Sequence, residues 1–201
     1  RWCSDVNNQS NIKNETRIAI FASGNGTNFE ALVNADLPAK ICVLVCDQPD
    51  VPVIQRAKNH QIPVILSLPQ KGVNKASREQ TLLQDLAPYH ITGLVLAGYM
   101  RIVGPTLLKA FPRRIINIHP ALLPSFPGRH GIEDAYDAGV KVTGVTIHYV
   151  DGGVDTGEII AQEAVSRTDQ DTLATLEAKI HSVEHQLYPK TVRQLIEKGV
   201  L

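Results

Sequence analysis

Short runs of strand composition alternate along this chain of 201 residues with stretches that carry helix signals. The runs lie at 17–22, 40–46, 63–66, 93–97 and 114–118. The second and fourth, which contain ICVLV and GLVLA, are apolar at nearly every position. Strands of this kind are buried on both faces, as in a parallel sheet that helices cover on each side. The alternation therefore predicts an α/β, Rossmann-like fold with an open, mostly parallel, twisted sheet.

Helical stretches fill the gaps between these runs, and Gly, Pro, Asn or Asp bounds each of them. They cover residues 28–34, 52–60, 75–87, 104–110 and 132–138. The rhythm then changes, because 142–150 and 158–165 read as two strands with no helix between them. This predicts an antiparallel addition near the C-terminal end of the sheet. A long amphipathic helix from 171 or 172 toward 198 closes the chain, with a break near Pro189 left open.

Length and charge limit the classes of protein that the chain can represent. We expect residues 17–201 to form a single domain and the polar residues 1–16 to be a flexible arm or an expression remnant. Because 20 Lys and Arg balance 20 Asp and Glu, no global field attracts nucleic acid or an anionic membrane. The apolar runs are also shorter than the roughly 20 residues of a membrane-spanning helix.

The three cysteines do not form a disulfide framework, because their number is odd. Cys42 and Cys46 share one face of a strand and are expected to be small core residues. No Cys or His spacing matches a zinc site, so no metal is expected. Together these features favour a cytoplasmic protein.

The segment SGNGTN at residues 23–28 joins the first strand to the first helix. Its glycines permit a tight turn, so that backbone N–H groups and the helix dipole can face a phosphate. A nicotinamide-cofactor fingerprint is an alternative, because Gly24-x-Gly26 is followed about twenty residues later by Asp47. Phe29 argues against it, since this ring occupies the place of the third glycine. A purely structural turn is the remaining alternative.

A polar pair ends the run at 114–118, where the sequence continues Asn117-Ile118-His119-Pro120. Strand alternation places the amide of Asn117 and the imidazole of His119 on one face. Pro120 favours extended geometry at His119 and opens a rigid loop. This pattern predicts polar chemistry at a carboxyl strand end, although a strand that simply enters a turn would look the same.

The loop between the last two strands, DGGVDTG at 151–157, carries two carboxylates on a flexible backbone. A buried carboxylate beside His119 would favour the imidazolium and fix its orientation, so that it could stabilise an oxyanion. Asn117 could supply a neutral donor to the same oxygen. Such a group lacks a serine or cysteine nucleophile, which suits direct transfer to an amine. The alternative is an ordinary turn.

Four segments together resemble the phosphoribosylglycinamide formyltransferases. They are SGNGTN, LAGYMRIV at 96–103, NIHPALLPSFPG at 117–128 and TGVTIHYVDGGVDTG at 143–157. The resemblance runs in order from about residue 17 to the C-terminus. It implies transfer of a formyl group from 10-formyltetrahydrofolate to the amino group of glycinamide ribonucleotide in purine biosynthesis.

The resemblance also implies roles for individual residues. Asn117, His119 and Asp155 correspond to the catalytic trio. Gly26, Thr27 and Asn28 correspond to the substrate-phosphate loop, and Glu184 to the residue that holds the ribose. The residues that correspond to the folate site are Arg78, Met100, Arg101, Ile102, Val103, Asp151, Gly152, Gly153 and Val154.

Simpler interpretations exist for several of these positions. Arg78 alone reads as a solvated helix charge, and Glu184 as a local pairing partner. His181 and His185 mimic a metal pair but have no recognisable third ligand. Thr146 and His148 read as core residues, with a supporting role left open.

Related chemistry offers rival functions. Methionyl-tRNA formyltransferase needs a further C-terminal domain and a basic surface, and formyltetrahydrofolate hydrolase needs an N-terminal regulatory domain. The balanced charge and the short flanks argue against both. A non-enzymatic nucleotide-binding module is the alternative from another class. The sequence is compatible with a homodimer and does not fix the oligomeric state.

Overall fold

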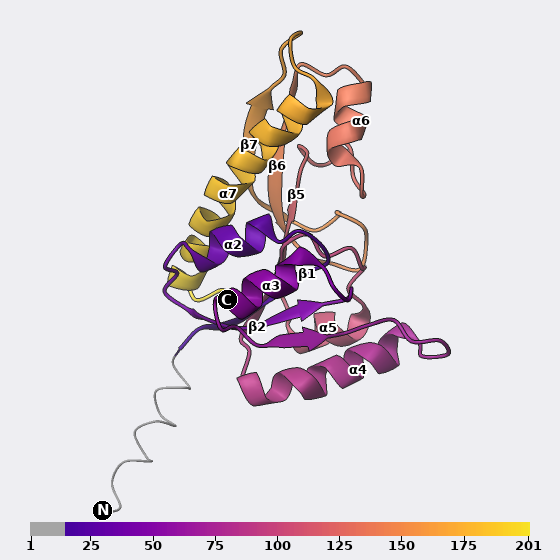
Figure 1. The fold of residues 1–201 in the computed structure, drawn as a ribbon, viewed down its shortest axis with the longest axis vertical. Helices are drawn as coiled ribbons and strands as arrows, with labels where there is room; N and C mark the ends of the chain where they lie inside the picture. Colours follow the sequence, from indigo (N-terminus) through magenta and orange to yellow (C-terminus); the bar gives the residue numbers. More distant parts are fainter. Residues whose placement is uncertain (1–14) are drawn as a thin grey trace, which may run out of the picture.

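The computed structural model describes residues 15–201 and shows one seven-stranded sheet (Figure 1). The strand order is β3-β2-β1-β4-β5-β6-β7. Strands β1 to β5 are parallel, β6 runs antiparallel to β5, and β7 runs antiparallel to β6. The strands are β1 (Arg17–Ala22), β2 (Lys40–Cys46), β3 (Val64–Leu66), β4 (Gly93–Leu96), β5 (Ile115–His119), β6 (Val142–Tyr149) and β7 (Ile159–Ser166). The predicted fold class is confirmed.

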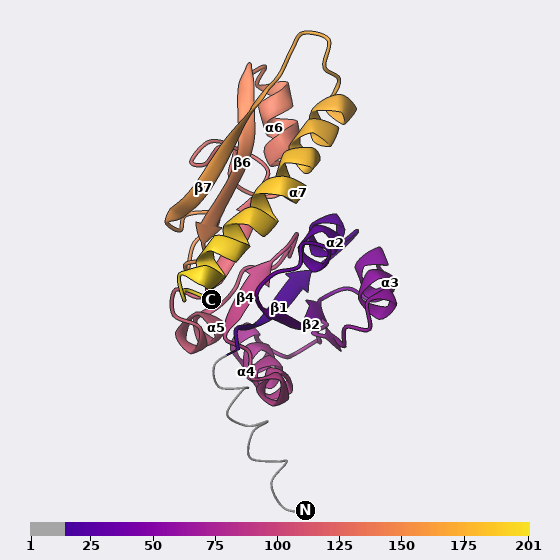
Figure 2. The same cartoon turned by 90° about the vertical axis from the view of Figure 1, so that its left-hand side faces the viewer.

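Helices cover both faces of this sheet, as Figure 2 shows. One core contains side chains of α2, α3, α6 and α7, and a second core on the opposite face contains side chains of α4 and α5. The helices are α2 (Thr27–Val33), α3 (Pro52–Asn59), α4 (Lys75–Leu86), α5 (Pro105–Ala110), α6 (Gly131–Asp137) and α7 (Leu173–Glu197), with a 3₁₀ turn at η1 (Ala87–Tyr89). The expected helices all form, within one or two residues of their predicted ends.

Two details that the sequence did not settle have a physical reason. The structure shows α7 without a break at Pro189, because the buried side chains on each side of this proline hold the helix against the core. The short turn η1 was not predicted, since it follows α4 directly. Residues 1–14 of the expected arm lie outside the described part of the chain, whereas the Thr16 carbonyl already accepts a hydrogen bond from Lys40 N.

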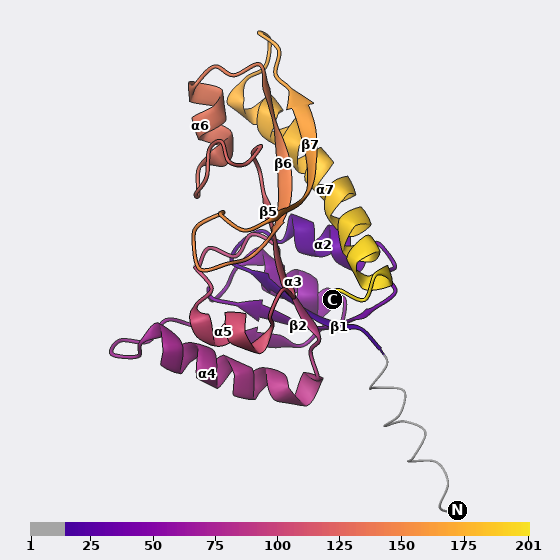
Figure 3. The ribbon, with the colours of Figure 1, turned by 180° about the vertical axis from the view of Figure 1, so that it is seen from behind.

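The strand order determines where a ligand can bind. β1 lies between β2 and β4: the connection after β1 leads to β2 on one side, and the connection after β3 returns to β4 on the other side. Ligands of open α/β sheets bind beyond the carboxyl strand ends at such a switch point. The loops after β1, β4 and β5 therefore meet at one edge. The loop between β6 and β7 projects on the side of α5 and α6 (Figure 3).

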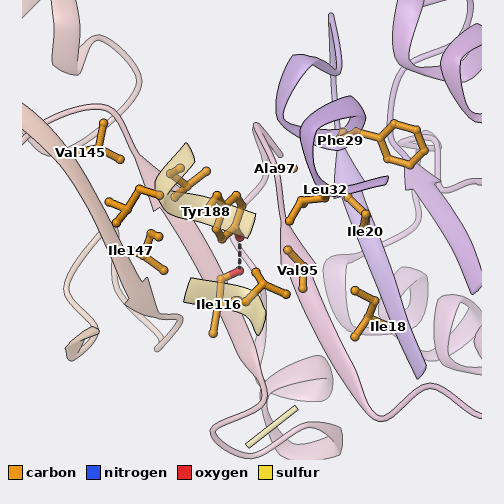
Figure 4. Close-up of a cluster of buried hydrophobic side chains, with 14 of the residues drawn as sticks. Ile18, Ile20, Phe29, Leu32, Val95, Ala97, Ile116, Val145, Ile147 and Tyr188 are labelled. Atoms are coloured by element: carbon orange, nitrogen blue, oxygen red, sulfur yellow. Dashed lines mark hydrogen bonds between the residues drawn. The ribbon is translucent and has the colours of Figure 1, made fainter. Parts of the chain in front are cut away.

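Tyr188 fixes α7 to the middle of the sheet. Its ring is fully buried in the larger core, next to Ile116 (Figure 4). Its hydroxyl donates to the Leu96 carbonyl at 2.6 Å and lies 3.4 Å from the Ile116 carbonyl. Burial raises the pKa of this phenol far above its usual value, so it acts as a donor at any physiological pH. Glu184, one helical turn earlier, is thereby placed over the strand ends.

Replacing Tyr188 by phenylalanine tests this anchor. The change keeps the ring and removes only the hydrogen bond to Leu96. We expect the free energy of unfolding in urea to fall by about 1–2 kcal/mol, the usual cost of losing a buried hydrogen bond. A variant as stable as the parent would show that the ring alone holds α7.

Candidate active site

A cavity of about 530 Å³ opens at the carboxyl ends of β1, β4 and β5. Its wall contains most of the residues that the sequence predicted for the site: Gly26, Thr27, Asn28, Met100, Arg101, Ile102, Val103, Asn117, His119, Asp151, Gly153, Val154, Asp155 and Glu184. Arg78 and Gly152 lie outside this wall. The structure therefore brings together segments as far apart in the chain as Gly26 and Glu184.

The glycine loop is held from outside by α3. Gly26 has φ of 78°, and a Cβ there would lie 2.5 Å from Cγ2 of Val53. Val53 N donates to the Gly24 carbonyl, and Arg56 Nε donates to the Asn25 carbonyl at 2.8 Å. The glycine is therefore required by the backbone turn and by close contact with α3, before any ligand is considered.

The structure argues against the nicotinamide-cofactor alternative, because Asp47 is not placed to bind a cofactor ribose. Asp47 is only 1% exposed and lies outside the cavity wall. One of its oxygens accepts a hydrogen bond from Ser23, and the other is paired with Arg101. Phe29 is fully buried in the core, where a dinucleotide fingerprint would have its third glycine.

His119 is the last residue of β5, and its ring is nearly buried. Its Nε2 lies 2.7 Å from the carbonyl oxygen of Phe126, and its Nδ1 lies 3.4 Å from Oδ2 of Asp155. A carbonyl oxygen can only accept, so Nε2 carries a proton in either charge state. The other ring nitrogen, Nδ1, faces the carboxylate.

A second imidazole orients Asn117. His148 Nδ1 donates to the Tyr149 carbonyl at 2.8 Å, so Nε2 is an acceptor in the neutral ring and a donor toward Asp155 in the protonated ring. Nδ2 of Asn117 lies 3.3 Å from this Nε2. The amide thus points its nitrogen toward His148, and its second N–H remains for a ligand. The sequence left a supporting role open for His148, and the structure places its ring beside the Asn117 amide.

Asp155 lies between the two imidazoles. Oδ2 accepts a hydrogen bond from Gly128 N at 2.7 Å, and Oδ1 lies 3.6 Å from Nε2 of His148. Burial opposes ionisation of this carboxyl, but the contact with His148, the Gly128 hydrogen bond and the charge of His119 outweigh it and lower the pKa of Asp155. The residue is thus a carboxylate at neutral pH.

Exposed apolar side chains border the same cavity on two sides, at residues 100–103 and 151–154, and we call these segments its two rims. Met100 and Ile102 are 47% and 49% exposed after β4, and Val154 is 48% exposed in the loop between β6 and β7. Asp151 shapes this loop, because its Oδ1 accepts from Thr156 Oγ1 and Gly153 N. The Thr156 hydrogen bond is the main reason that the pKa of Asp151 is lowered. The rims can contact a flat, largely apolar ligand from both sides.

Glu184 reaches the cavity from α7 and is 4% exposed. Its Oε2 lies 2.7 Å from Nδ1 of the exposed His181, which also lines the cavity. The metal alternative for His181 and His185 gains no support, because residues 15–201 contain no group of three or more metal-ligating side chains. His181 instead pairs with the carboxylate.

Sequence reasoning missed the contacts that the backbone supplies to the site. The Phe126 carbonyl and the Gly128 N–H belong to the proline-rich loop, whose path a sequence does not reveal. Thr146 fixes the start of this loop, since its hydroxyl donates to the Ala121 carbonyl and accepts from Leu123 N. The alternation of β6 puts Thr146 and His148 on one face, and this signal leaves a supporting role open for both residues.

Comparisons with known proteins agree with this geometry. A family model described as formyl transferase matches residues 16–192. A phosphoribosylglycinamide formyltransferase of Bacillus subtilis is 48% identical over 184 residues, which cover 90% of this chain and 94% of the relative. The chain belongs to the phosphoribosylglycinamide formyltransferase family.

Solved structures of the phosphoribosylglycinamide formyltransferase family have the same fold. The enzyme of Bacillus halodurans matches with a TM-score of 0.88 and 54% identity, over 92% of this chain and 97% of that one. Glycinamide ribonucleotide transformylase 1 of Geobacillus kaustophilus matches with a TM-score of 0.87 and 49% identity, over 90% and 98%.

Membership of the phosphoribosylglycinamide formyltransferase family confirms the predicted enzyme class, with formyl transfer from 10-formyltetrahydrofolate to glycinamide ribonucleotide as its reaction. The domain boundaries, the roles of individual residues, a homodimer and a cytoplasmic location stay predictions. In the described part of the chain, no helix combines the length and the apolar character needed to cross a membrane.

The pair of His181 and Glu184 predicts a pH-dependent stability. The hydrogen bond with Glu184 outweighs burial and raises the pKa of His181 above its usual 6.5. A histidine whose pKa is higher in the folded protein than in the unfolded chain stabilises the fold. This contribution is complete at pH values below the unfolded-state pKa, and it is lost as the pH rises through the folded-state pKa. We therefore expect His181→Gln to lower the free energy of unfolding more at about pH 5.5 than at about pH 8.5.

Urea unfolding of both proteins at each pH measures this difference. The matched control is His90→Asn, at an exposed histidine with positive φ that asparagine tolerates. An effect of His181→Gln that is equal at both pH values would contradict the assigned charge pair.

Proposed function

We propose that this chain formylates glycinamide ribonucleotide with 10-formyltetrahydrofolate by direct attack of the substrate amine, with Asn117 and His119 stabilising the oxyanion and Asp155 orienting His119. The observation that carries this assignment is the geometry around His119. A donor-rich strand end, a buried carboxylate and two apolar rims converge on one cavity. Family membership supplies the two substrates.

The chemical step requires donors where negative charge develops. When the amine attacks the formyl carbon, the carbonyl oxygen becomes an oxyanion, and the bond from carbon to N10 of the folate then breaks. The second N–H of Asn117 and the Nδ1–H of a protonated His119 can both reach into the cavity. N10 leaves with a proton as the amine loses one, and Nδ1 can relay it, because Nε2 stays bonded to Phe126.

A covalent intermediate on the protein is not supported by the described cavity wall. This wall contains Ser23 but no cysteine. The Ser23 hydroxyl donates to Oδ1 of Asp47 and accepts from Met100 N, so both its proton and its oxygen are engaged within the protein. Direct transfer between the two substrates needs no such nucleophile.

The two substrates would occupy opposite sides of His119. Glycinamide ribonucleotide is assigned to Gly26, Thr27 and Asn28 through its phosphate, and to Glu184 through its ribose. The folate is assigned to the rims, that is to residues 100–103 and 151–154. Arg78 and Gly152 lie outside the cavity wall, so they would contact only a part of the folate that projects from it.

Substitution of the trio tests the chemical step. We expect His119→Ala, Asn117→Ala and Asp155→Ala each to reduce kcat by about 100-fold or more, because each removes an oxyanion donor or its orienting group. The losses should not add in double variants, since the groups act as one unit. If His119→Ala turns over at a near-normal rate with both substrates saturating, the assignment of this site is wrong.

Glu184 separates a transferase from a hydrolase. A carboxylate that holds the ribose positions the acceptor amine, and losing such positioning can cost about 100-fold without touching a catalytic group. We expect Glu184→Ala to raise KM for glycinamide ribonucleotide strongly and to leave KM for 10-formyltetrahydrofolate nearly unchanged. Glu197→Ala, at an exposed position of the same helix, is the matched control.

Both half-reactions should be followed on one preparation, as consumption of the folate and as formylated ribonucleotide. If the parent protein consumes 10-formyltetrahydrofolate equally fast without the ribonucleotide, water is the acceptor and a formyltetrahydrofolate hydrolase is the better assignment.

The same proposal covers the class of acceptor, the cellular location and the oligomeric state. The balanced charge supports a small-molecule acceptor rather than a nucleic acid, and the lack of disulfide spacing supports the cytoplasm. A homodimer remains one option for assembly, which light scattering of the purified protein would test.

A further inference from the structure

Asp47 is a buried carboxylate that the proposed reaction does not use. It follows β2 directly and is 1% exposed, although it lies outside the cavity wall. An ionised carboxylate at such a position is strongly destabilising unless other groups compensate its charge. Both of its oxygens are in fact engaged, and both partners line the substrate cavity.

The first partner is Ser23, at the end of β1. Its hydroxyl lies 2.5 Å from Oδ1 of Asp47, and a carboxylate can only accept, so the serine proton points to Asp47. The hydroxyl oxygen then accepts from Met100 N at 2.9 Å. Ser23 N also donates to the Gly98 carbonyl at 3.1 Å. Asp47 thus fixes the rotation of a hydroxyl that holds the backbone at Met100.

The second partner is Arg101, the next residue of the same segment. Its Nε lies 2.7 Å from Oδ2 of Asp47. Nε makes no hydrogen bond with this oxygen, so the contact is an ion pair. With its guanidinium drawn inward, Arg101 is only partly exposed, whereas its neighbours Met100 and Ile102 present about half of their surface. Asp47 therefore acts on two successive residues of the predicted folate segment.

The far end of this segment is fixed independently by Glu79 of α4, which is 4% exposed. Its oxygens accept from Gly104 N at 2.5 Å and Leu107 N at 3.3 Å, at the start of α5. This helix has no side-chain cap of its own, so Glu79 satisfies its free N–H groups. A Cβ at Gly104 would lie 2.8 Å from Oε2 of Glu79, which explains the glycine.

These contacts make residues 100–103 a short span that is held at both ends. We propose that Asp47 is a positioning residue for the formyl-folate donor: through Ser23 and Arg101 it sets the place of the segment that forms one rim of the donor site. This role rests on the proposed function. Because Glu79 keeps the Gly104 end in place, loosening the other end displaces the rim and leaves α5 where it is.

The proposal predicts a selective kinetic change. Asp47→Asn keeps the size of the side chain but presents an uncharged amide to Arg101. We expect KM for 10-formyltetrahydrofolate to rise about 10-fold or more, because the ion pair is lost and the amide must turn its NH2 group toward either Arg101 or the Ser23 hydroxyl. KM for glycinamide ribonucleotide should stay within about twofold, since α3 holds the glycine loop separately.

Two further variants make the test specific. Asp50→Asn removes one charge from an exposed position three residues later and is the matched control, with unchanged constants expected. Ser23→Ala keeps the carboxylate and its ion pair but removes the hydroxyl link to Met100. It should raise KM for the folate alone, by less than Asp47→Asn. It also keeps the proposal testable if Asp47→Asn does not fold.

The outcomes separate this inference from its alternatives. A donor KM that is unchanged in Ser23→Ala and in any folded Asp47→Asn, with lower stability in urea, would show that Asp47 only stabilises the fold and would overturn the proposal. Equal increases of both KM values would overturn it as well. If instead the parent protein forms no formylated ribonucleotide, the proposed function itself fails, which is a distinct result.

Discussion

β6 runs antiparallel to β5, and this pairing places the polar groups of the reactive centre. His148 lies opposite Asn117, and Thr146 lies opposite His119. Directly opposed residues of an antiparallel pair project to the same face at close distance. The pairing therefore gives Asn117 its orienting imidazole and gives the proline-rich loop its anchor at Thr146. A parallel strand at this position would need a crossover connection, and the short loop that carries Asp155 could not return to His119.

The remaining walls depend on polar groups that the protein buries and satisfies. Asp47 and Glu79 are both nearly inaccessible, and each connects a strand or helix to the loop after β4. Replacing such groups by apolar residues of similar size is often neutral for stability in proteins. Their presence at the rim of a cavity is therefore better explained by the need to hold exposed apolar side chains, such as Met100 and Ile102, in one place. Without these tethers the two side chains could collapse onto the rim across the cavity.

Much of this arrangement could be predicted from the sequence, because strand periodicity and glycine signals are local. The apolar runs gave the parallel strands, and the alternation at Asn117 and His119 gave the strand-end donors. The pairing of Asp47 with Arg101 could not be predicted, since the two residues meet only through the strand order. Pro189 shows that a local signal can also mislead. Proline usually ends a helix, but the burial of the residues around it keeps α7 continuous. The backbone carbonyl of Phe126 leaves no signal in the side-chain sequence at all.

That carbonyl determines how the imidazole proposed for the chemical step can work. Nε2 of His119 is engaged by Phe126, and a Cβ on Gly131 would lie only 3.0 Å from the same nitrogen. The ring therefore presents Nδ1 alone to the cavity. At 3.4 Å from Nδ1, Asp155 is farther than in a typical charge-assisted hydrogen bond, while Gly128 N binds the same carboxylate oxygen at 2.7 Å. A substrate oxyanion can thus compete for the Nδ1 proton without displacing Asp155, whose negative charge is retained by the Gly128 hydrogen bond. In the proposed mechanism, Asp155 therefore lies beside the Nδ1 position without holding it in a short hydrogen bond, so a proton there can be shared with the reacting oxygen.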